Sequence, residues 1–184
     1  MTAAQQIPDL TPATWTIDPV HSSVGFSVRH LMVSKVRGSF ERFSGEITIA
    51  EDPLLSSARV EIDMSSIDTR NEDRDNDLRS TNFFESDRYP VMTFVTTGVR
   101  GSGTDYTVTG DLTIKGTTRP VELDVEYNGV QVDSPLGTRA GFAATTEISR
   151  KEFGITFDMP LEGGGTVVGD KIKIDLDIQA VLQA

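Results

Sequence analysis

The chain has 184 residues, a length that predicts one domain with a substantial hydrophobic core. Lys and Arg number 17 against 28 Asp and Glu. The net charge of −11 argues against a protein that binds nucleic acid, or that docks on anionic lipid through its bulk charge. The absence of cysteine excludes disulfides, thiolate zinc sites and cysteine nucleophiles.

The N-terminal residues give no targeting signal. The stretch 1–14 contains neither a basic residue nor an apolar run, so it lacks the pattern of a signal peptide. No part of the sequence approaches the ~18 consecutive apolar residues of a membrane-spanning helix. We therefore expect a cytoplasmic protein with a flexible N-terminal segment, residues 1–13, and a single domain over residues 14–184.

Apolar and polar residues alternate along most of the chain, which is the pattern of half-buried β-strands. A short strand at 15–17 comes first, and further strands follow near 23–30, 36–40, 47–49 and 58–64. The apolar faces of these strands carry Val24, Phe26, Val28, His30, Val36, Gly38, Phe40, Ile47, Ile49, Ala58, Val60, Ile62 and Met64.

Residues 69–82 interrupt this alternation with a highly polar segment. Thr69 and Glu72 have the spacing of a capping box, and Asp75 and Arg79 are spaced to pair on one helix face. We expect a short solvated helix that ends against the two phenylalanines following it.

Alternation then resumes in strands near 92–94, 107–114, 121–127, 139–149 and 171–182. The last strand is the clearest, because apolar residues alternate there with Lys, Asp and Gln. The apolar faces of this half carry Met92, Phe94, Val108, Gly110, Leu112, Ile114, Val121, Leu123, Val125, Tyr127, Ile172, Ile174, Leu176, Ile178, Ala180 and Leu182. Phe142, Ala144 and Ile148 belong to the strand near 139–149, whose alternation does not single out an inward face.

These strands and the Gly, Pro, Asn and Asp residues between them predict an all-β fold. Closing the sheet on itself buries every apolar face and removes the exposed edges. We therefore predict an eight-stranded antiparallel barrel with one short helical excursion. A two-sheet sandwich is the alternative architecture.

The two histidines, His21 and His30, give little support for a metal site. They are nine residues apart and would face opposite sides of one strand, so a metal would need distant ligands. We expect His21 to tie down the start of a strand by a hydrogen bond. His30 faces inward, either as a hydrogen-bonded buried imidazole or as a contact for a ligand headgroup.

Other apparent motifs lack essential parts. Aspartates alternate at 73–77 as in a calcium loop, but Leu78 and Phe84 stand where an EF-hand needs Gly and Glu. The glycines at 163–165 lack the Lys-Ser/Thr of a phosphate loop, and we expect a mobile rim loop there. With no Gly-x-Ser-x-Gly elbow either, the sequence predicts no catalytic residue, no metal and no cofactor.

The inward faces alone do not decide between a packed core and a ligand cavity. A barrel of eight strands is near the size at which the interior is either filled by side chains or holds one small ligand. Gly38 and Gly110 lie on inward faces and are compatible with room for a ligand.

A set of short motifs, taken in their order along the chain, resembles the YceI-like family of polyisoprenoid-binding proteins over residues 14–182. Each motif is short, and their shared order makes the resemblance specific. The motifs are WTIDPVHSSVGFSVRH at 15–30, VRGSF at 36–40, FSG at 43–45, FFESDRYPVMTF at 83–94, GDLTIKGTTRPV at 110–121, ISRKEFGI at 148–155 and VGD at 168–170.

The resemblance implies an extended lipocalin-like barrel around an apolar tunnel. The tunnel would hold a long isoprenoid chain of the polyprenyl or isoprenoid-quinone type, or a similar amphiphile, for non-enzymatic binding, storage or transport. The resemblance also implies a homodimer, and Arg29, His30 and Arg150 are the candidates for headgroup contacts. The residues expected to line the tunnel are Phe26, Val28, His30, Phe40, Ile47, Ile49, Val60, Ile62, Met64, Phe84, Met92, Phe94, Val108, Leu112, Phe142, Ile148, Phe153, Ile174 and Leu176.

Two alternatives stay open at the level of the sequence. One is an enzyme that acts on an apolar substrate inside the barrel, which would need an acid or base with a perturbed pKa in the cavity. The other is a structural or interaction barrel whose interior is fully packed.

Overall fold

The alternating segments form one antiparallel sheet in the computed structural model, which describes residues 9–132, 134–159 and 167–183. The strands found there are β1 (Ala13–Ile17), β2 (Ser23–His30), β3 (Ser34–Phe40), β4 (Phe43–Ile49), β5 (Ser57–Asp63), β6 (Ile67–Asp68), β7 (Val91–Ser102), β8 (Asp105–Ile114), β9 (Thr117–Gln131), β10 (Arg139–Ser149) and β11 (Val168–Leu182). The helices are α1 (Glu72–Arg79) and the 3-10 turns η1 (Pro53–Leu55), η2 (Met64–Ser66) and η3 (Arg150–Phe153). None of the described helices is long and apolar enough to cross a membrane.

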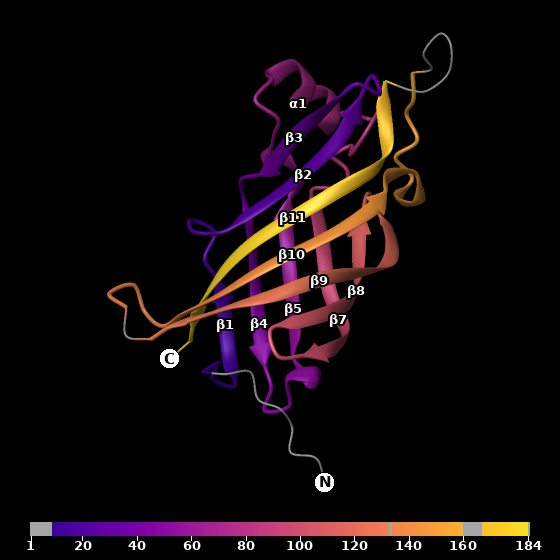
Figure 1. Cartoon of the computed structure of the whole chain (residues 1–184). Helices are drawn as coiled ribbons and strands as arrows, with labels where there is room; N and C mark the ends of the chain where they lie inside the picture. The colour runs from indigo at the N-terminus through magenta and orange to yellow at the C-terminus, as the bar shows by residue number, and fades with distance from the viewer. Residues whose placement is uncertain (1–8, 133, 160–166, 184) are drawn as a thin grey trace.

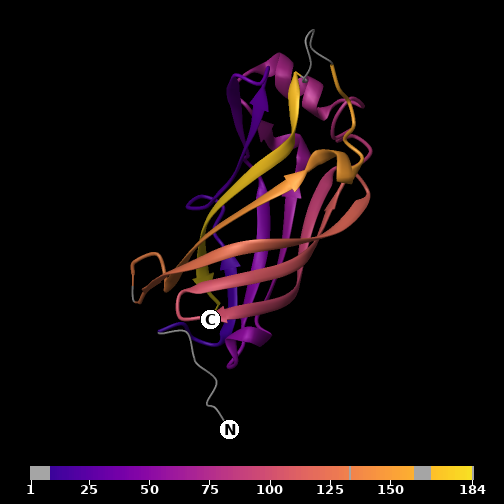
Figure 2. The ribbon, with the colours of Figure 1, turned by 45° about the vertical axis from the view of Figure 1, so that its right-hand side comes forward.

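Eight of the strands close into a barrel (Figures 1 and 2). Hydrogen bonding runs in the order β1, β4, β5, β7, β8, β9, β10, β11, and β11 pairs again with β1 from Trp15↔Leu182 to Ile17↔Ala180. The neighbouring strands are antiparallel throughout. The predicted eight-stranded antiparallel barrel is confirmed, and the sandwich alternative is wrong because the sheet closes on itself.

The long strand β11 has two successive partners on one edge. Its residues 180–182 pair with β1, and its residues 168–177 pair with β2. From β2 the sheet continues to β3 and then to the short β6, which α1 follows. These elements lengthen the barrel at the end drawn uppermost in Figure 1, whereas the β4–β5 connection with η1 lies at the opposite end.

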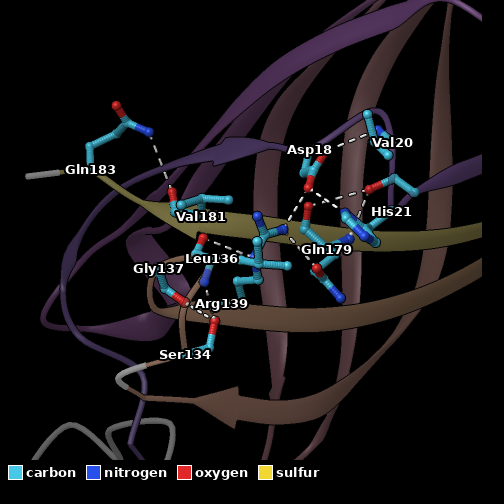
Figure 3. Close-up of polar contacts among 11 residues, drawn as sticks. Asp18, Val20, His21, Ser134, Leu136, Gly137, Arg139, Gln179, Val181 and Gln183 are labelled. Atoms are coloured by element: carbon cyan, nitrogen blue, oxygen red, sulfur yellow. Dashed lines mark hydrogen bonds and ion pairs between the residues drawn. The ribbon is translucent and has the colours of Figure 1, made fainter.

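The chain passes from β1 to β2 through a cluster of polar contacts, shown in Figure 3. Oδ2 of Asp18 accepts a hydrogen bond from Arg139 Nη1 at 2.5 Å and lies 2.7 Å from His21 Nδ1. Arg139 of β10 also donates to Oε1 of Gln179 on β11, at 2.7 Å. Asp18 thus joins the β1–β2 connection to β10 through its carboxylate and to β11 through its backbone N–H, which donates to the Gln179 carbonyl at 2.9 Å. The predicted hydrogen bond of His21 beside a strand start is confirmed.

Helix α1 begins later than the capping-box pattern predicted. Its N-cap is Asn71, whose Oδ1 accepts from a backbone N–H of the first turn at 2.9 Å. Thr69, predicted as the cap, instead donates from N and Oγ1 to the buried carboxylate of Asp75 at 2.9 and 2.6 Å. The predicted pair of Asp75 with Arg79 is also wrong, because Arg79 donates to backbone carbonyls of residues 65–67.

The structure describes the predicted flexible segment, residues 1–13, only from residue 9 onward. Leu10 is buried there in the same apolar cluster as Trp15 and Ala180. Nε1 of Trp15 donates to the Thr11 carbonyl at 3.0 Å. Burial and this hydrogen bond hold the chain against the barrel just before β1.

Candidate ligand-binding cavity

The inward faces of the strands enclose a cavity of about 300 Å³. Pro53 of η1 lines it at one end of the barrel, and Val28 and Val168 line it at the end near α1. Nearly all of its lining side chains are aliphatic or aromatic. Protein ligand pockets span roughly 300–1,000 Å³, so the barrel has interior space of ligand size with an apolar wall.

Strand register explains how each row of side chains reaches this cavity. Val108 of β8 lies between Val99 of β7 and Leu123 of β9, and all three line the cavity. On the same strand, Asp111 lies three residues beyond Val108 and is exposed on the outer face. Side chains alternate between the faces of a strand, so the apolar positions turn inward together.

Two of the residues predicted to line the tunnel lie outside the cavity wall, and the others line it. His30 ends β2 beyond Val28, half-buried between its pairing partners Ser34 and Val168. Met64 is buried in the core, but the chain leaves β5 for η2 there, so the strand alternation no longer applies. These two assignments were wrong; ligand contact by the others stays a prediction.

The two inward glycines make room for aromatic rings, which fill the space expected for a ligand. A Cβ at Gly110 would overlap the ring of Phe94 and lie 2.7 Å from the Val95 carbonyl oxygen. A Cβ at Gly38 would overlap the ring of Phe26, whose centroid is 5.7 Å from that of Phe40. Small residues therefore let large apolar rings pack along the cavity wall.

Arg150 is a charged side chain in the cavity wall and is buried. Its guanidinium donates to the carbonyls of Ile155, Phe157, Val168 and Gly169 at 2.8–3.1 Å. Four of its five N–H donors are thereby used within the protein. The arginine ties η3 and the segment after it to the start of β11, which leaves little capacity for the predicted headgroup contact.

The other ionisable side chains of the described cavity wall are two tyrosines, Tyr106 and Tyr127. Burial raises the pKa of each phenol, and for Tyr127 the negative charge of Asp9 adds to this effect. Both phenols are therefore neutral at physiological pH. Of the remaining headgroup candidates, Arg29 is exposed and His30 lies outside the wall.

Several wall residues were absent from the predicted set although the sequence contained their signal. Residues 121–127 alternate clearly, and Val121, Leu123, Val125 and Tyr127 all line the cavity. Val99 gave no such signal, because the register of β7 shifts between Thr96 and Gly98 and reverses the alternation.

The rejected calcium-loop motif does not gather ligands in the described residues. Asp75 faces Thr69 and is buried, whereas Asp73 and Asp77 are exposed. No group of three or more His, Asp or Glu side chains is arranged to hold a metal within the described ranges. The predicted rim loop at 163–165 lies outside the residues that the structure describes.

Comparison with known proteins agrees with this architecture. A UPF0312 protein of Staphylococcus epidermidis is 42% identical over 163 residues, which cover 88% of this chain and 93% of that protein. The solved structure of BcnA from Burkholderia cenocepacia superposes with a TM-score of 0.76 at 24% identity, over 90% of this chain and 99% of that one.

A second solved structure, described as a polyisoprenoid-binding domain from Saccharophagus degradans, superposes with a TM-score of 0.69 at 18% identity. It covers 94% of this chain and is itself covered completely, at 100%. At these identities the two superpositions establish a shared fold. The family model described as the YceI-like domain matches residues 15–180, and the chain therefore belongs to the YceI-like family.

Proposed function

We propose that the barrel binds the apolar chain of a long isoprenoid, of the polyprenyl or isoprenoid-quinone type, or of a similar amphiphile, and stores or transports it without chemical change. The observation that carries the proposal is the apolar cavity that extends from η1 to the α1 end of the barrel. The name of the Saccharophagus degradans domain, which shares the fold, supports an isoprenoid over other apolar ligands.

Burial of hydrocarbon supplies the binding energy in this proposal. Each CH₂ moved from water into an apolar site contributes about 0.8 kcal/mol. A five-carbon prenyl unit therefore contributes on the order of 3–4 kcal/mol before the cost of ordering the ligand. A few such units suffice for micromolar affinity without specific hydrogen bonds, so selectivity comes from the length and width of the cavity.

The cavity wall also bears on the two alternatives. A fully packed barrel conflicts with an interior space of about 300 Å³. An enzyme would need a proton donor or acceptor at the substrate, and the ionisable groups of the described wall are Tyr106, Tyr127 and the hydrogen-bonded Arg150. The wall therefore favours binding over acid–base catalysis.

Lipid occupancy tests the proposal directly. The protein is purified without detergent and extracted with organic solvent, and the extract is analysed by mass spectrometry. We expect prenyl lipid in amounts comparable to the protein. In Val108→Trp, the added ring enters the cavity between Val99 and Leu123, so the extracted lipid is expected to be lost or shortened.

Asp111→Trp is the matched control, because Asp111 lies on the same strand and is exposed. It is expected to keep the lipid of the wild type. An extract without apolar lipid would overturn the proposal. Unchanged lipid in correctly folded Val108→Trp would show that the ligand lies elsewhere. Conversion of the added lipid into a product by the purified protein would favour the enzyme alternative.

Two expectations from the sequence are independent of this proposal. The homodimer and the cytoplasmic location stay predictions, which sedimentation of the purified protein and fractionation of the native host can test.

A further inference from the structure

The hairpin turn between β2 and β3 exposes three consecutive apolar side chains. Leu31, Met32 and Val33 are 41%, 52% and 82% exposed. The backbone N–H of Leu31 donates to the Val167 carbonyl at 2.9 Å, so the turn is anchored at its base. Apolar side chains grouped at a projecting tip are a surface that water solvates poorly and that marks an interaction site.

The backbone of this turn makes the choice of residues unusual. Leu31 and Met32 have φ angles of 53° and 61°, and Val33 N–H donates to the His30 carbonyl at 3.2 Å. This is the geometry of a type I′ hairpin turn, whose two central positions favour Asn, Asp and Gly. Large apolar side chains are disfavoured in this backbone conformation, so folding and solubility both disfavour the residues found here.

Five basic side chains lie near the apolar tip, on the outer face of β2, β3 and β11. Arg29 of β2 pairs with Lys35 of β3. Two residues earlier in β2, Ser27 pairs with Arg37 on one side and with Lys173 of β11 on the other. Lys171 is exposed on the neighbouring stretch of β11, as are the other four. Among the described residues no ion pair joins any of the five to a carboxylate.

The charge of the outer face changes sign with distance from the tip. Along β11, Lys171 and Lys173 are followed by Asp175 and Asp177, all four exposed. Two carboxylates lie close to these lysines. Glu147 of β10 is opposite Lys173 in the register, and Asp170, next to Lys171, accepts hydrogen bonds from Ser149 and from the backbone N–H of Lys151. In a chain with a net charge of −11, five of the 17 basic residues thus lie on the three strands beside the apolar turn.

The opposite end of the barrel has an apolar turn with the opposite charge. In η1 the side chains of Leu54 and Leu55 are 43% and 75% exposed. The residues before η1 are the acidic Glu51 and Asp52. The two ends are far apart in both views (Figures 1 and 2). An anionic surface would therefore attract the β2–β3 turn and repel η1.

We propose that the β2–β3 turn docks on an anionic lipid bilayer, with residues 31–33 inserted among the headgroups and the basic collar of Arg29, Lys35, Arg37, Lys171 and Lys173 facing the lipid phosphates. Apolar insertion and cationic contact reinforce each other at such a surface. This docking proposal does not depend on the ligand proposed above. Docking nevertheless brings the membrane to Val28 and Val168, where the cavity wall begins.

Single labels test the orientation on the otherwise unchanged protein. The chain contains no cysteine, so Val33→Cys and Leu55→Cys each give one site for an environment-sensitive fluorophore. Vesicles of phosphatidylcholine mixed with phosphatidylglycerol are expected to shift the emission of the label at 33 towards the blue and to leave the label at 55 unchanged. Vesicles of phosphatidylcholine alone are expected to have little effect on either label.

Variants test the two parts of the surface by sedimentation with the same vesicles. Arg29→Gln and Lys35→Gln are each expected to lower the partition coefficient on anionic vesicles about fivefold, and added salt to have the same direction of effect. Met32→Ser and Val33→Ser are each expected to lower it about tenfold. Arg59→Gln and Leu55→Ser, which alter exposed residues away from the turn, are expected to bind as the wild type does.

Equal shifts of the two labels, equal binding to neutral and anionic vesicles, or equal losses in the test and control variants would overturn the docking proposal. The vesicle assays use delipidated protein, and the lipid content of each variant is measured separately. A protein that carries lipid but ignores vesicles refutes the docking alone. A protein that docks but carries no lipid refutes the proposed function alone.

Discussion

At the β1–β2 connection, the Asp18 carboxylate accepts hydrogen bonds from the Arg139 guanidinium and from the His21 imidazole. The hydrogen bond from Arg139, then that from His21, and the backbone N–H of Val20 hold the pKa of Asp18 far below its ordinary value of 3.8. The ionised carboxylate is therefore stabilised in the folded chain more than in the unfolded one. The folded state therefore gains stability at every pH at which Asp18 is ionised in the unfolded chain.

Asp18→Asn is expected to lower the free energy of unfolding by about 2 kcal/mol at neutral pH, because charge-assisted hydrogen bonds are lost. The difference in the free energy of unfolding between the variant and the wild type is largest above about pH 4. It shrinks as the pH falls further, because Asp18 then becomes protonated in the unfolded chain. Urea denaturation at a series of pH values measures it. Asp177→Asn, on the exposed face of β11, serves as the control; a difference that does not depend on pH would contradict this account.

Gly110 illustrates how one small residue shapes the cavity wall. An alanine there would collide with the Phe94 ring and with a carbonyl oxygen of the neighbouring strand, which cannot move independently of the sheet. Gly110→Ala is expected to cost about 1–3 kcal/mol and to reduce lipid occupancy by displacing the ring. Gly141→Ala is the control, because its Cβ would meet Asn128 Cβ at an ordinary 3.5 Å. Thermal denaturation with lipid extraction measures both, and equal effects at the two sites would refute the steric account.

At the scale of elements, α1 is the one α-helix among the described residues, and it depends on its cap. Asn71→Ala removes the acceptor for a first-turn N–H and is expected to cost about 1 kcal/mol. Asn76→Ala, on an exposed side of the same helix, loses an exposed hydrogen bond from Arg79 and gains helix propensity, so it is expected to be close to neutral. The free energies of unfolding of the two variants test this. A cap variant as stable as the wild type would mean that the helix is held by Asp75 and its partner alone.

The sequence predicted those features that depend on local alternation. β9 and β11 were predicted with the correct inward faces because each is long and pairs on both sides. Alternation alone did not predict the extension through β2, β3 and β6, because it depends on β11 pairing with two separate strands along one edge; the expectation of an extended barrel came from the family resemblance. The late start of α1 was missed because Thr69 had a better partner in the fold than in the local pattern.

The predicted site was also limited to what local alternation shows, because contacts across the barrel cannot be derived from it. Val99 lies beyond a register shift, so alternation assigns it to the wrong face. Met64 lies where a strand gives way to a 3-10 turn, and it is buried in the core without lining the cavity. The inward glycines were compatible with room for a ligand at the level of the sequence, because the rings that pack against them, Phe26 and Phe94, are not their neighbours in sequence. Inward faces follow from the sequence, whereas the volume they leave follows from packing.

At the scale of the whole molecule, closure and cavity depend on each other. Closing the sheet pairs the edges of β1 and β11, and the inner faces then surround a space that side chains only partly fill. An empty apolar space deprives its wall of dispersion contacts. A ligand that fills it restores those contacts in the folded state and has no equivalent site in the unfolded chain. Binding should therefore appear as stability.

Delipidated protein is accordingly expected to unfold at a lower temperature than protein purified with its lipid, and added prenyl alcohols are expected to reverse the loss. At a free concentration of a hundred times Kd, one bound ligand stabilises by about 2.7 kcal/mol. At equal concentration, geranylgeraniol should raise the unfolding midpoint more than the shorter farnesol does. Each added prenyl unit buries more hydrocarbon until the cavity is full. In Val108→Trp the rise should stop at a shorter chain, since the new ring occupies part of the path, whereas Asp111→Trp should follow the wild type. Differential scanning calorimetry of the three proteins decides the matter: a wild-type midpoint that does not respond to any prenyl alcohol would mean that the interior space is not a site for isoprenoid chains.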